Sequence, residues 1–239
     1  TGTVAMGKDM FGGQFIQVSV QYYAPFGAKK YTLCTKQYNI KQFGGKVKFK
    51  ELAVEPIPHP ESSDLICAML TRGTQFVEFT QKPYYAHANG FMYVPIYGGF
   101  KRCPINSRVV IDPDGYQKFC NANRWFSKST ISEVPAELIH MTMPTVPVFS
   151  LEYRMWGEIP VLNMGSIMFD KTAFDRTVLP QAYKDTLSPL VANFYNTNCV
   201  DFIAGKKKGL VFLLGGKPGT GKTLTAQAIA ELNEKPLYC

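Results

Sequence analysis

Hydrophobic and polar residues alternate along the N-terminal part of the chain. Within residues 15–23, Ile16, Val18, Val20 and Tyr22 alternate with polar residues, which is the period-two pattern of a strand with one buried face. Four later segments are also predicted to be strands: residues 47–49, 74–80, 91–97 and 108–111. The chain is therefore predicted to begin as a β structure.

Turn-forming residues separate these segments. Asn89-Gly90 is a strong hairpin signal, because both residues tolerate the positive φ angles of a type I′ turn. Gly44-Gly45, Gly98-Gly99 and the run from Asp112 to Gly115 are also predicted to be turns. Together, the strands and turns predict a mostly antiparallel sheet or a small barrel over about residues 10–135.

A proline-rich stretch follows the predicted strands. Residues 134–150 contain Pro135, Pro144 and Pro147, and each proline removes a backbone donor and restricts the residue before it. We therefore place the domain boundary there. The sequence predicts a β-rich N-terminal domain over residues 1–145, a linker over residues 146–168 and a second domain over residues 169–239.

Helical periodicity appears beyond this boundary. Apolar residues from Leu187 to Phe194 recur at the spacing of one helix face. Ser188-Pro189 lies within this stretch, and proline is tolerated at the first position of a helix. Either a new helix begins there with Ser188 as its cap, or a longer helix is kinked at Pro189.

An unbroken apolar run over residues 210–214 precedes a glycine-rich segment. Such a run suits a strand that is buried on both faces of a parallel sheet. Residues 222–232 are predicted to form a helix with Leu224, Ala228 and Leu232 on one side, and residues 236–238 are predicted to begin a second strand. The predicted fold class is α+β, with the β-rich N-terminal domain followed by the beginning of an α/β P-loop module.

The segment between the apolar run and this helix is Gly216-Lys217-Pro218-Gly219-Thr220-Gly221-Lys222-Thr223. It fits the phosphate-binding pattern G-x-x-x-x-G-K-[ST], the Walker A motif. Its glycines allow backbone N–H groups to point at phosphate oxygens, and the first turn of the following helix adds unpaired N–H donors. Lys222 is expected to contact the β- and γ-phosphates, and the Thr223 hydroxyl is expected to coordinate Mg²⁺.

Composition indicates a globular protein and adds no second site. Apolar residues make up 46% of the 239 residues, and charged residues make up 18%, which is enough apolar surface for a core. The six cysteines contain no Cys-x-x-Cys pair and the three histidines have no metal-ligand spacing, so reduced thiols and no zinc site are expected. No apolar run is long enough to span a membrane, and an intracellular location, cytoplasmic or nuclear, is expected.

The net charge of +8 raises the question of nucleic acid binding. The basic residues are spread along the chain, and the densest run is only Lys206-Lys207-Lys208. Phosphate tracking needs a longer basic stripe, so this run is interpreted as a solvated loop. Nucleic acid is therefore not expected as a partner, and the net charge by itself does not exclude it.

Residues on both sides of the phosphate-binding motif resemble the start of an AAA+ ATPase module. The likeness lies in Phe169-Asp170, in residues 173–180 and 201–210, and in Leu224-Thr225-Ala226. It is closest to fungal AAA-domain proteins in which a β-rich region precedes one AAA module. Weaker likeness to that upstream region occurs over residues 70–76 and 108–113.

This resemblance implies an ATP hydrolase that assembles as a ring, usually a hexamer, and remodels or translocates a protein substrate. Residues 216–224 would bind ATP and Mg²⁺, Lys222 and Thr223 would serve catalysis, and Val178 and Leu179 would lie near the adenine. Lys217 replaces the proline common in the family, and its side chain is expected to point away from the phosphates. The β-rich domain would recognise the substrate or anchor the ring.

The family's catalytic Glu, sensor residue and arginine fingers lie well after the P-loop. We therefore expect the natural protein to continue past Cys239, and we expect the present chain alone to be a poor ATPase. One competing hypothesis is a scaffold protein whose N-terminal domain builds an assembly and whose ATPase module is mobile or degenerate. Another is a P-loop kinase or nucleic-acid motor, which would not explain residues 174–180.

Overall fold

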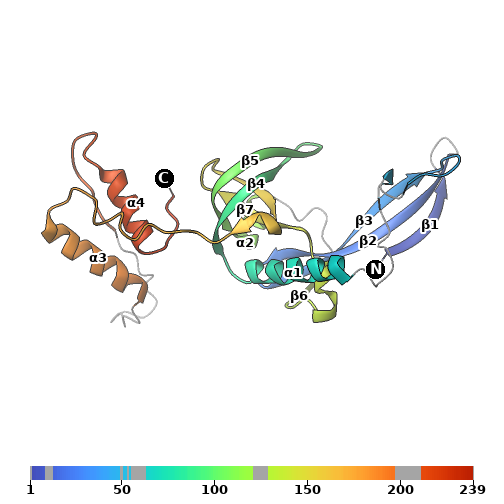
Figure 1. The fold of residues 1–239 in the computed structure, drawn as a ribbon, viewed down its shortest axis with the longest axis horizontal. Coiled ribbons are helices and arrows are strands. Elements are labelled where there is room, and N and C mark those ends of the chain that lie inside the picture. The colour runs from blue at the N-terminus through green and yellow to red at the C-terminus, as the bar shows by residue number, and fades with distance from the viewer. Residues whose placement is uncertain are drawn as a thin grey trace. The chain divides into compact units, whose positions relative to one another are not determined.

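The computed structural model describes residues 2–8, 13–48, 51–52, 54, 63–120, 129–196 and 211–238. Helices and antiparallel sheets both occur, so the fold is α+β, as the sequence predicts. The chain divides into two compact units, unit 1 over Thr1–Ser166 and unit 2 over Ile167–Cys239. Figure 1 labels the four α-helices and the strands β1 to β7.

The first sheet of unit 1 is built on a long hairpin. Its order is β1 (Gly2–Lys8), β2 (Gln14–Gly27), β3 (Lys30–Lys41) and β6 (Thr130–Ile131), and every pairing is antiparallel. The turn between β2 and β3 contains Lys29 at φ 54°. Figure 1 shows β2 and β3 as one twisted ribbon, with β1 beside the part of β2 far from that turn.

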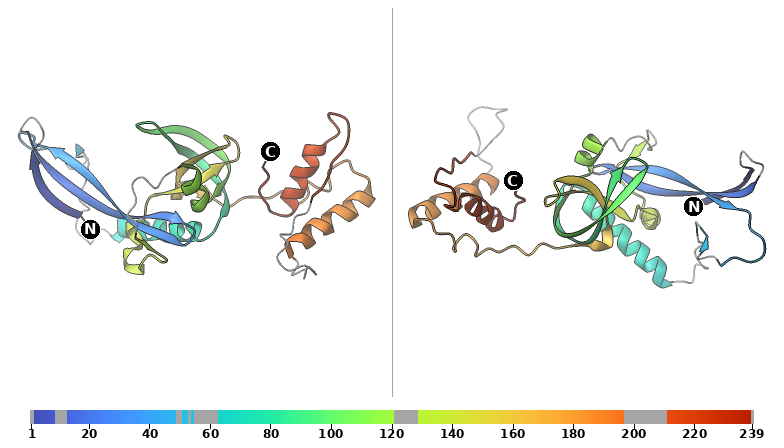
Figure 2. Two further views of the ribbon diagram at one scale, coloured as in Figure 1. Left: turned by 180° about the vertical axis from the view of Figure 1, so that it is seen from behind. Right: turned by 90° about the horizontal axis from the view of Figure 1, so that it is seen from above.

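The second sheet of unit 1 closes on itself. It contains β4 (Tyr84–Ile96), β5 (Gly99–Ile111), β7 (Thr145–Ser150), β8 (Met155–Pro160) and β9 (Met164–Gly165). The antiparallel pairings β4–β5, β5–β7, β7–β8 and β8–β4 return to the starting strand. The result is the small barrel that the sequence predicts as one of two options, and the right-hand view of Figure 2 shows it as a ring.

Helices cover the sheets of unit 1. These are α1 (Ser63–Thr80), α2 (Pro113–Cys120) and the short 3₁₀ helices η3 (Ala136–Met141) and η4 (Val161–Asn163). Phe76 of α1 is fully buried in the main core beside residues of the barrel strands such as Val109, Val146 and Ile159. Burial of these apolar side chains is the dominant stabilising term of this unit.

The prediction of a strand over residues 74–80 is wrong, because these residues form the end of α1. Gly73, Phe76 and Thr80 are buried along this stretch, which is the spacing of one helix face. Only Phe76 of the three is a large apolar residue, so the helical period is not visible in hydrophobicity alone.

Two predicted turns have different structures. Asn89 and Gly90 lie inside β4, and the hairpin turns instead at Tyr97-Gly98, where Gly98 has φ +84°. Gly90 is needed because the Asn163 side chain approaches it so closely that a Cβ would lie 2.2 Å from Nδ2. The run from Asp112 caps α2: Asp112 Oδ1 accepts a 3.0 Å hydrogen bond from the Gly115 N–H, with proline at the first helical position.

The predicted linker over residues 146–168 is also wrong as far as Gly165, since β7, β8 and β9 all belong to the second sheet. Val146, Val148 and Ile159 are fully buried. Pro147 and Pro160 are accommodated in these strands, although proline removes a ladder donor. The division between the two units falls later, after Ser166.

The described residues of unit 2 form two helices, α3 (Gln181–Asn196) and α4 (Lys222–Leu232). Helix α3 continues through Pro189, so of the two options the longer helix is correct. Helix α4 has the predicted bounds, but its buried residues are Thr225 and Ala228, whereas Leu224 is 58% exposed. The buried residues of this unit also include Phe174, Thr177 and Val191.

The strands predicted over residues 210–214 and 236–238 do not form in the described part of unit 2. Residues 211–217 and 235–238 carry no strand assignment. Val211 and Leu213 are 90% and 96% exposed. An extended segment becomes a strand only when a neighbour pairs with its backbone, and none of the described segments does so. The strand predicted over residues 47–49 does not form at Val47 and Lys48 either, and residue 49 lies outside the described residues. Residues 201–210, including Lys206-Lys207-Lys208, also lie outside them.

Candidate phosphate-binding loop

The glycine-rich motif forms a loop directly before α4. Gly216, Gly219 and Gly221 have φ angles of 150°, 81° and 84°, in the region that side chains rarely adopt. At Gly216 a Cβ would also lie 2.9 Å from Thr220 Oγ1, whereas Gly219 and Gly221 face open space. The three glycines are therefore required by the backbone path of the loop.

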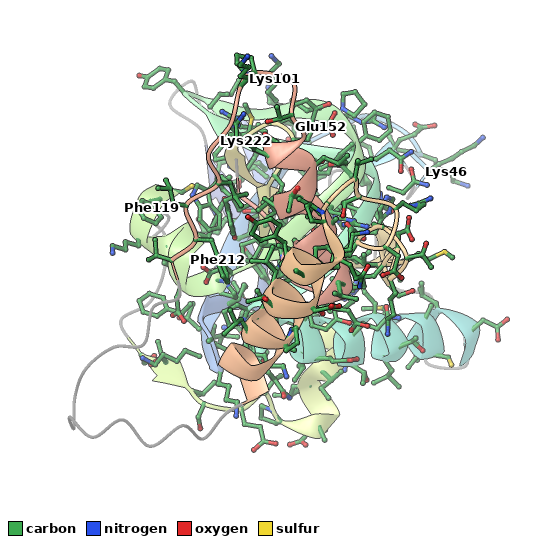
Figure 3. All side chains as sticks on the ribbon, turned by 90° about the vertical axis from the view of Figure 1, so that its left-hand side faces the viewer. Lys46, Lys101, Phe119, Glu152, Phe212 and Lys222 are labelled. Carbon is green, nitrogen blue, oxygen red and sulfur yellow. The ribbon has the colours of Figure 1, made fainter. Side chains whose placement is uncertain are left out.

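Lys222 is the first residue of α4, and its side chain turns back to the loop (Figure 3). Its Nζ donates hydrogen bonds to the carbonyl oxygens of Gly216 at 3.1 Å and Lys217 at 2.8 Å. Thr220 Oγ1 lies 3.4 Å from the same Nζ. The ammonium group is thus held by the loop that encloses it.

Thr220 fixes the turn that surrounds this ammonium group. Its hydroxyl and its N–H both donate to the Lys217 carbonyl, at 2.9 Å and 3.4 Å. The motif assigns Thr220 no role of its own, because it accepts any residue at this position. The spacing of three residues between Lys217 and Thr220 could have predicted this contact, since a threonine hydroxyl readily closes a short turn of this kind.

The N-terminus of α4 has no competing negative group of its own. Gly221 is the N-cap, no side chain caps the helix, and the first turn contains no acidic residue. Thr225 donates from its N–H and its hydroxyl to the Gly221 carbonyl, at 2.8 Å and 3.0 Å. The first N–H groups of the helix, with the positive end of its dipole, are therefore available to an anion.

Thr223 and Leu224 follow on the exposed side of α4. Thr223 is exposed, so its hydroxyl is accessible to an incoming ion. In the described residues there is no group of three or more His, Cys, Asp or Glu side chains that could hold a metal ion. A magnesium ion at Thr223 would therefore take its other ligands from phosphate oxygens and water.

The two residues expected near the adenine are not joined to this loop. Val178 is fully exposed and Leu179 is half-buried. Among the described residues no hydrogen bond links either of them to residues 216–224; the Leu179 N–H donates to the Thr177 carbonyl. The structure brings Lys222, Lys217, Thr220 and the loop glycines together, and it leaves Val178 and Leu179 outside that group.

The segment before Val178 is anchored at the other end of α4. The Asp170 N–H donates to Glu231 Oε2 at 3.0 Å, and Lys171 pairs with Glu234 at 2.8 Å. Asp170 also accepts hydrogen bonds from the N–H and hydroxyl of Thr172 and pairs with Arg176. The hydrogen bonds from Thr172 lower the pKa of Asp170, and the nearby Arg176 acts in the same direction.

Comparisons with known proteins add no relative to this picture. No family model, no curated protein and no solved structure matches the chain. None of the helices that the structure describes is long and apolar enough to cross a membrane. The site must therefore be interpreted from its own residues.

Proposed function

We propose that the chain binds ATP through residues 216–224 and that unit 2 is the beginning of an AAA+-type ATPase module. The observation that carries this proposal is the position of the Lys222 ammonium group, which the loop carbonyls of Gly216 and Lys217 hold at 3.1 Å and 2.8 Å. This position inside the glycine-rich loop is where the lysine of a phosphate-binding loop must lie to contact the β- and γ-phosphates.

Local charge supports the same function. Residues 211–223 carry Lys217 and Lys222 and no acidic residue. The unpaired N–H groups at the start of α4 add a further partial positive charge. On binding, Lys222 would exchange its carbonyl partners for the β- and γ-phosphate oxygens, and the Thr223 hydroxyl would join the Mg²⁺ shell.

Two exposed apolar residues of unit 2 fit a base-binding role. Leu224 is 58% exposed and Val178 is fully exposed, so both can contact an adenine ring without displacing a core side chain. We propose that Val178 and Leu179 approach the base only when nucleotide is present. This step requires the segment after Thr177 to move while Asp170 and Lys171 stay paired with α4.

For the whole protein we propose ATP hydrolysis in a ring, coupled to remodelling or translocation of a protein substrate. This proposal rests on the resemblance of residues 169–239 to AAA+ proteins together with the loop geometry. Unit 1 would supply recognition, since it is a separate compact unit with a hydrophobic core of its own.

The test is a titration of the chain with a fluorescent ATP analogue in the presence of Mg²⁺. Lys222→Ala should weaken binding by about 10- to 100-fold, because it removes charge-assisted hydrogen bonds to the phosphates. Lys217→Ala is the matched control, since it removes an equal charge from the same loop, and its affinity should stay within about threefold of the unaltered chain. Equal affinities of the Lys222→Ala variant and the unaltered chain would refute the proposal.

A further inference from the structure

The hairpin formed by β4 and β5 ends in an apolar tip. The two strands pair in register up to Ile96 opposite Gly99, and the chain reverses at Tyr97-Gly98. Ile96, Tyr97 and Phe100 are 54%, 106% and 59% exposed. We call residues 95–100 the tip; they contain no charged residue.

The tip is open to its surroundings in the described part of unit 1. A Cβ added at Gly98 or Gly99 would meet no heavy atom within 4 Å. Figure 1 shows the joined end of β4 and β5, in green, standing clear of the other elements of this unit, and the left-hand view of Figure 2 shows the same from behind. Single exposed apolar residues are common, whereas a contiguous uncharged set marks a contact surface.

This tip is apolar on both faces of the hairpin. Pro95 lies opposite Phe100, and Ile96 belongs to the next row towards the turn. Since successive rows of a strand pair point to opposite faces, Phe100 and Ile96 lie on opposite faces. A flat protein partner would cover one face and leave the other in water. A lipid layer surrounds an inserted tip on every side.

A pair of cations follows directly behind the tip. Lys101 lies opposite Val94, and Arg102 lies opposite Tyr93 in the next row. The two cations therefore lie on opposite faces of the hairpin, and both are exposed. Each face thus changes from apolar to cationic at nearly the same distance from the turn, which is the layering that a membrane surface has.

The length of the tip matches the outer part of a bilayer. At about 3.4 Å per residue, the segment from Tyr97 to the row of Val94 is about 10 Å long. Interfacial elements bury their apolar part about 5–10 Å deep, at the boundary between headgroups and acyl chains. The row of Lys101 would then lie at the level of the lipid phosphates.

Arg102 is directed away from the tip. Its Cζ lies 3.4 Å from the centre of the Phe91 ring, and Phe91 is two residues further from the turn than Tyr93, which lies opposite Arg102. Long cationic side chains take this direction at a membrane surface, because the charge stays with the headgroups while the apolar part is buried.

The charge of the hairpin favours anionic lipid. Residues 84–111 contain Lys101, Arg102 and Arg108 and no Asp or Glu. A negatively charged membrane surface attracts each nearby Lys or Arg, and a neutral surface does not. An apolar tip backed by two cations therefore fits a bilayer that contains phosphatidylserine or another acidic phospholipid.

Acidic residues of the neighbouring strands leave this charge in place. Glu158 of β8 already accepts hydrogen bonds from the hydroxyls of Tyr116 and Thr145. Glu152 lies in the turn between β7 and β8, and Arg154 in the same turn offsets its charge. The cationic layer of the hairpin is therefore not neutralised by these two carboxylates.

We propose that the tip of the β4–β5 hairpin inserts into the outer part of a bilayer that contains anionic lipid. Ile96, Tyr97 and Phe100 would enter the region of the acyl chains, and Lys101 and Arg102 would contact lipid phosphates. The tip is too short to span a bilayer, so the contact is peripheral. One tip binds weakly, and several tips on one assembly would strengthen the attachment.

This inference goes beyond the proposed ATP binding, because it places unit 1 at a membrane surface. The residues that carry it belong to β4 and β5 and involve no nucleotide contact. Vesicle binding without nucleotide therefore tests it separately: vesicle binding can fail while ATP binding succeeds, and the reverse can also occur.

The experiment measures sedimentation of the full chain with vesicles of phosphatidylcholine, with and without phosphatidylserine, in the absence of nucleotide. Ile96→Thr with Phe100→Thr keeps strand-forming residues but removes apolar surface, and it should lower the partition coefficient by about tenfold or more. Leu65→Gln with Leu70→Gln is the matched control, since these α1 residues are 45% and 40% exposed. Its partition coefficient should stay within about twofold of the unaltered chain.

A second pair of variants tests the charge. Lys101→Gln with Arg102→Gln should lower partitioning into phosphatidylserine vesicles by about tenfold and leave the weaker binding to pure phosphatidylcholine nearly unchanged. Lys36→Gln with Lys41→Gln removes an equal charge from exposed positions of β3. Partitioning of this control should stay within about threefold of the unaltered chain. Circular dichroism of all variants checks that the fold is intact.

Insertion is measured with tryptophan at the tip. The added fluorescence of Phe100→Trp, relative to the unaltered chain, should shift to shorter wavelength on vesicles and be quenched by lipids brominated in their acyl chains. Val4→Trp places the same probe at a position of β1 that is 70% exposed. Its added fluorescence should not be quenched.

The proposal is overturned if neither kind of vesicle binds the chain, or if the tip variant and the Leu65→Gln/Leu70→Gln control bind equally well. It is also overturned if the chain binds while Phe100→Trp is not quenched, because charge alone would then hold it at the surface. Binding of single-stranded DNA that the tip variant abolishes, without vesicle binding, would assign the hairpin to nucleic acid. Dimerisation that the tip variant abolishes, again without vesicle binding, would assign it to self-association, and both outcomes contradict insertion.

Discussion

The Tyr116 hydroxyl donates a 3.1 Å hydrogen bond to Glu158 Oε1, which joins helix α2 to strand β8 of the barrel. The Thr145 hydroxyl of β7 donates to the other carboxylate oxygen at 2.9 Å. Burial raises the pKa of Glu158 despite these two donors. Burial also raises the pKa of Tyr116, so this phenol keeps its proton and remains the donor.

This relationship predicts a pH dependence of stability. Because the folded-state pKa of Glu158 lies above its unfolded-state value, its contribution is complete below the unfolded pKa and is lost as the pH rises through the folded pKa. Glu158→Gln removes the titration and keeps an oxygen acceptor for one hydroxyl. The free energy of unfolding of the variant, relative to the unaltered chain, should therefore increase as the pH rises.

Urea denaturation at several pH values between about 4 and about 8 measures this difference. Glu152→Gln is the matched control, because Glu152 is an exposed glutamate in the turn between β7 and β8. Its relative stability should vary little over the same range. If the difference in free energy of unfolding between Glu158→Gln and the unaltered chain does not change with pH, the Glu158 carboxyl is solvated in the folded state.

The contact between α1 and η3 predicts an unusual effect of alanine. Alanine at Gly73 would place its Cβ 2.3 Å from the carbonyl oxygen of Ile139, and this backbone atom cannot move aside cheaply. Alanine gains about 1 kcal/mol of helix propensity over glycine, but overpacking costs about 1–3 kcal/mol. Gly73→Ala should therefore destabilise unit 1 despite lying in the middle of a helix.

Gly44→Ala provides the comparison for this prediction. No heavy atom lies within 4 Å of a Cβ at Gly44, so alanine there should be neutral or stabilising by up to about 1 kcal/mol. Thermal unfolding of the two variants gives the test. A Gly73→Ala protein at least as stable as Gly44→Ala would mean that α1 and η3 are not packed as described.

Pro189 is the clearest local conflict in unit 2. Helix α3 continues through it from Gln181 to Asn196, although proline in a helix interior costs about 3 kcal/mol relative to alanine. Pro189→Ala should slow hydrogen exchange of the amides of residues 190–192. Pro180→Ala changes a proline before the helix and should leave the exchange rates of these amides unchanged. If both variants change these exchange rates to a similar extent, α3 does not pass through Pro189.

The sequence predicted the elements whose signal is local. Helix α4 has the expected bounds, because Gly221 adopts φ +84° directly before a run of good helix formers. The strand over residues 74–80 was wrong, since Gly73 and Thr80 complete a helical face that hydrophobicity does not register. The turn at Asn89-Gly90 was wrong because Gly90 serves the close approach of Asn163, a contact between residues far apart in the chain.

Within the candidate site, the motif predicted which residues meet but not all of their partners. Lys222 and the loop glycines follow directly from the pattern. The hydrogen bonds of Thr220 to Lys217 depend on the path of the loop, which the pattern does not specify. The strand over residues 210–214 depends on a neighbouring strand, so its apolar run alone could not decide it.

The central claim is that the backbone around Lys222 binds the phosphates of ATP, and amide hydrogen exchange of residues 216–224 with and without Mg²⁺-ATP tests it most directly. We predict slower exchange at the amides of residues 219–224 when ATP is bound, and loss of that protection in Lys222→Ala at the same ATP concentration. Unchanged exchange over residues 216–224 while ATP is bound, with protection elsewhere in the chain, would contradict the account.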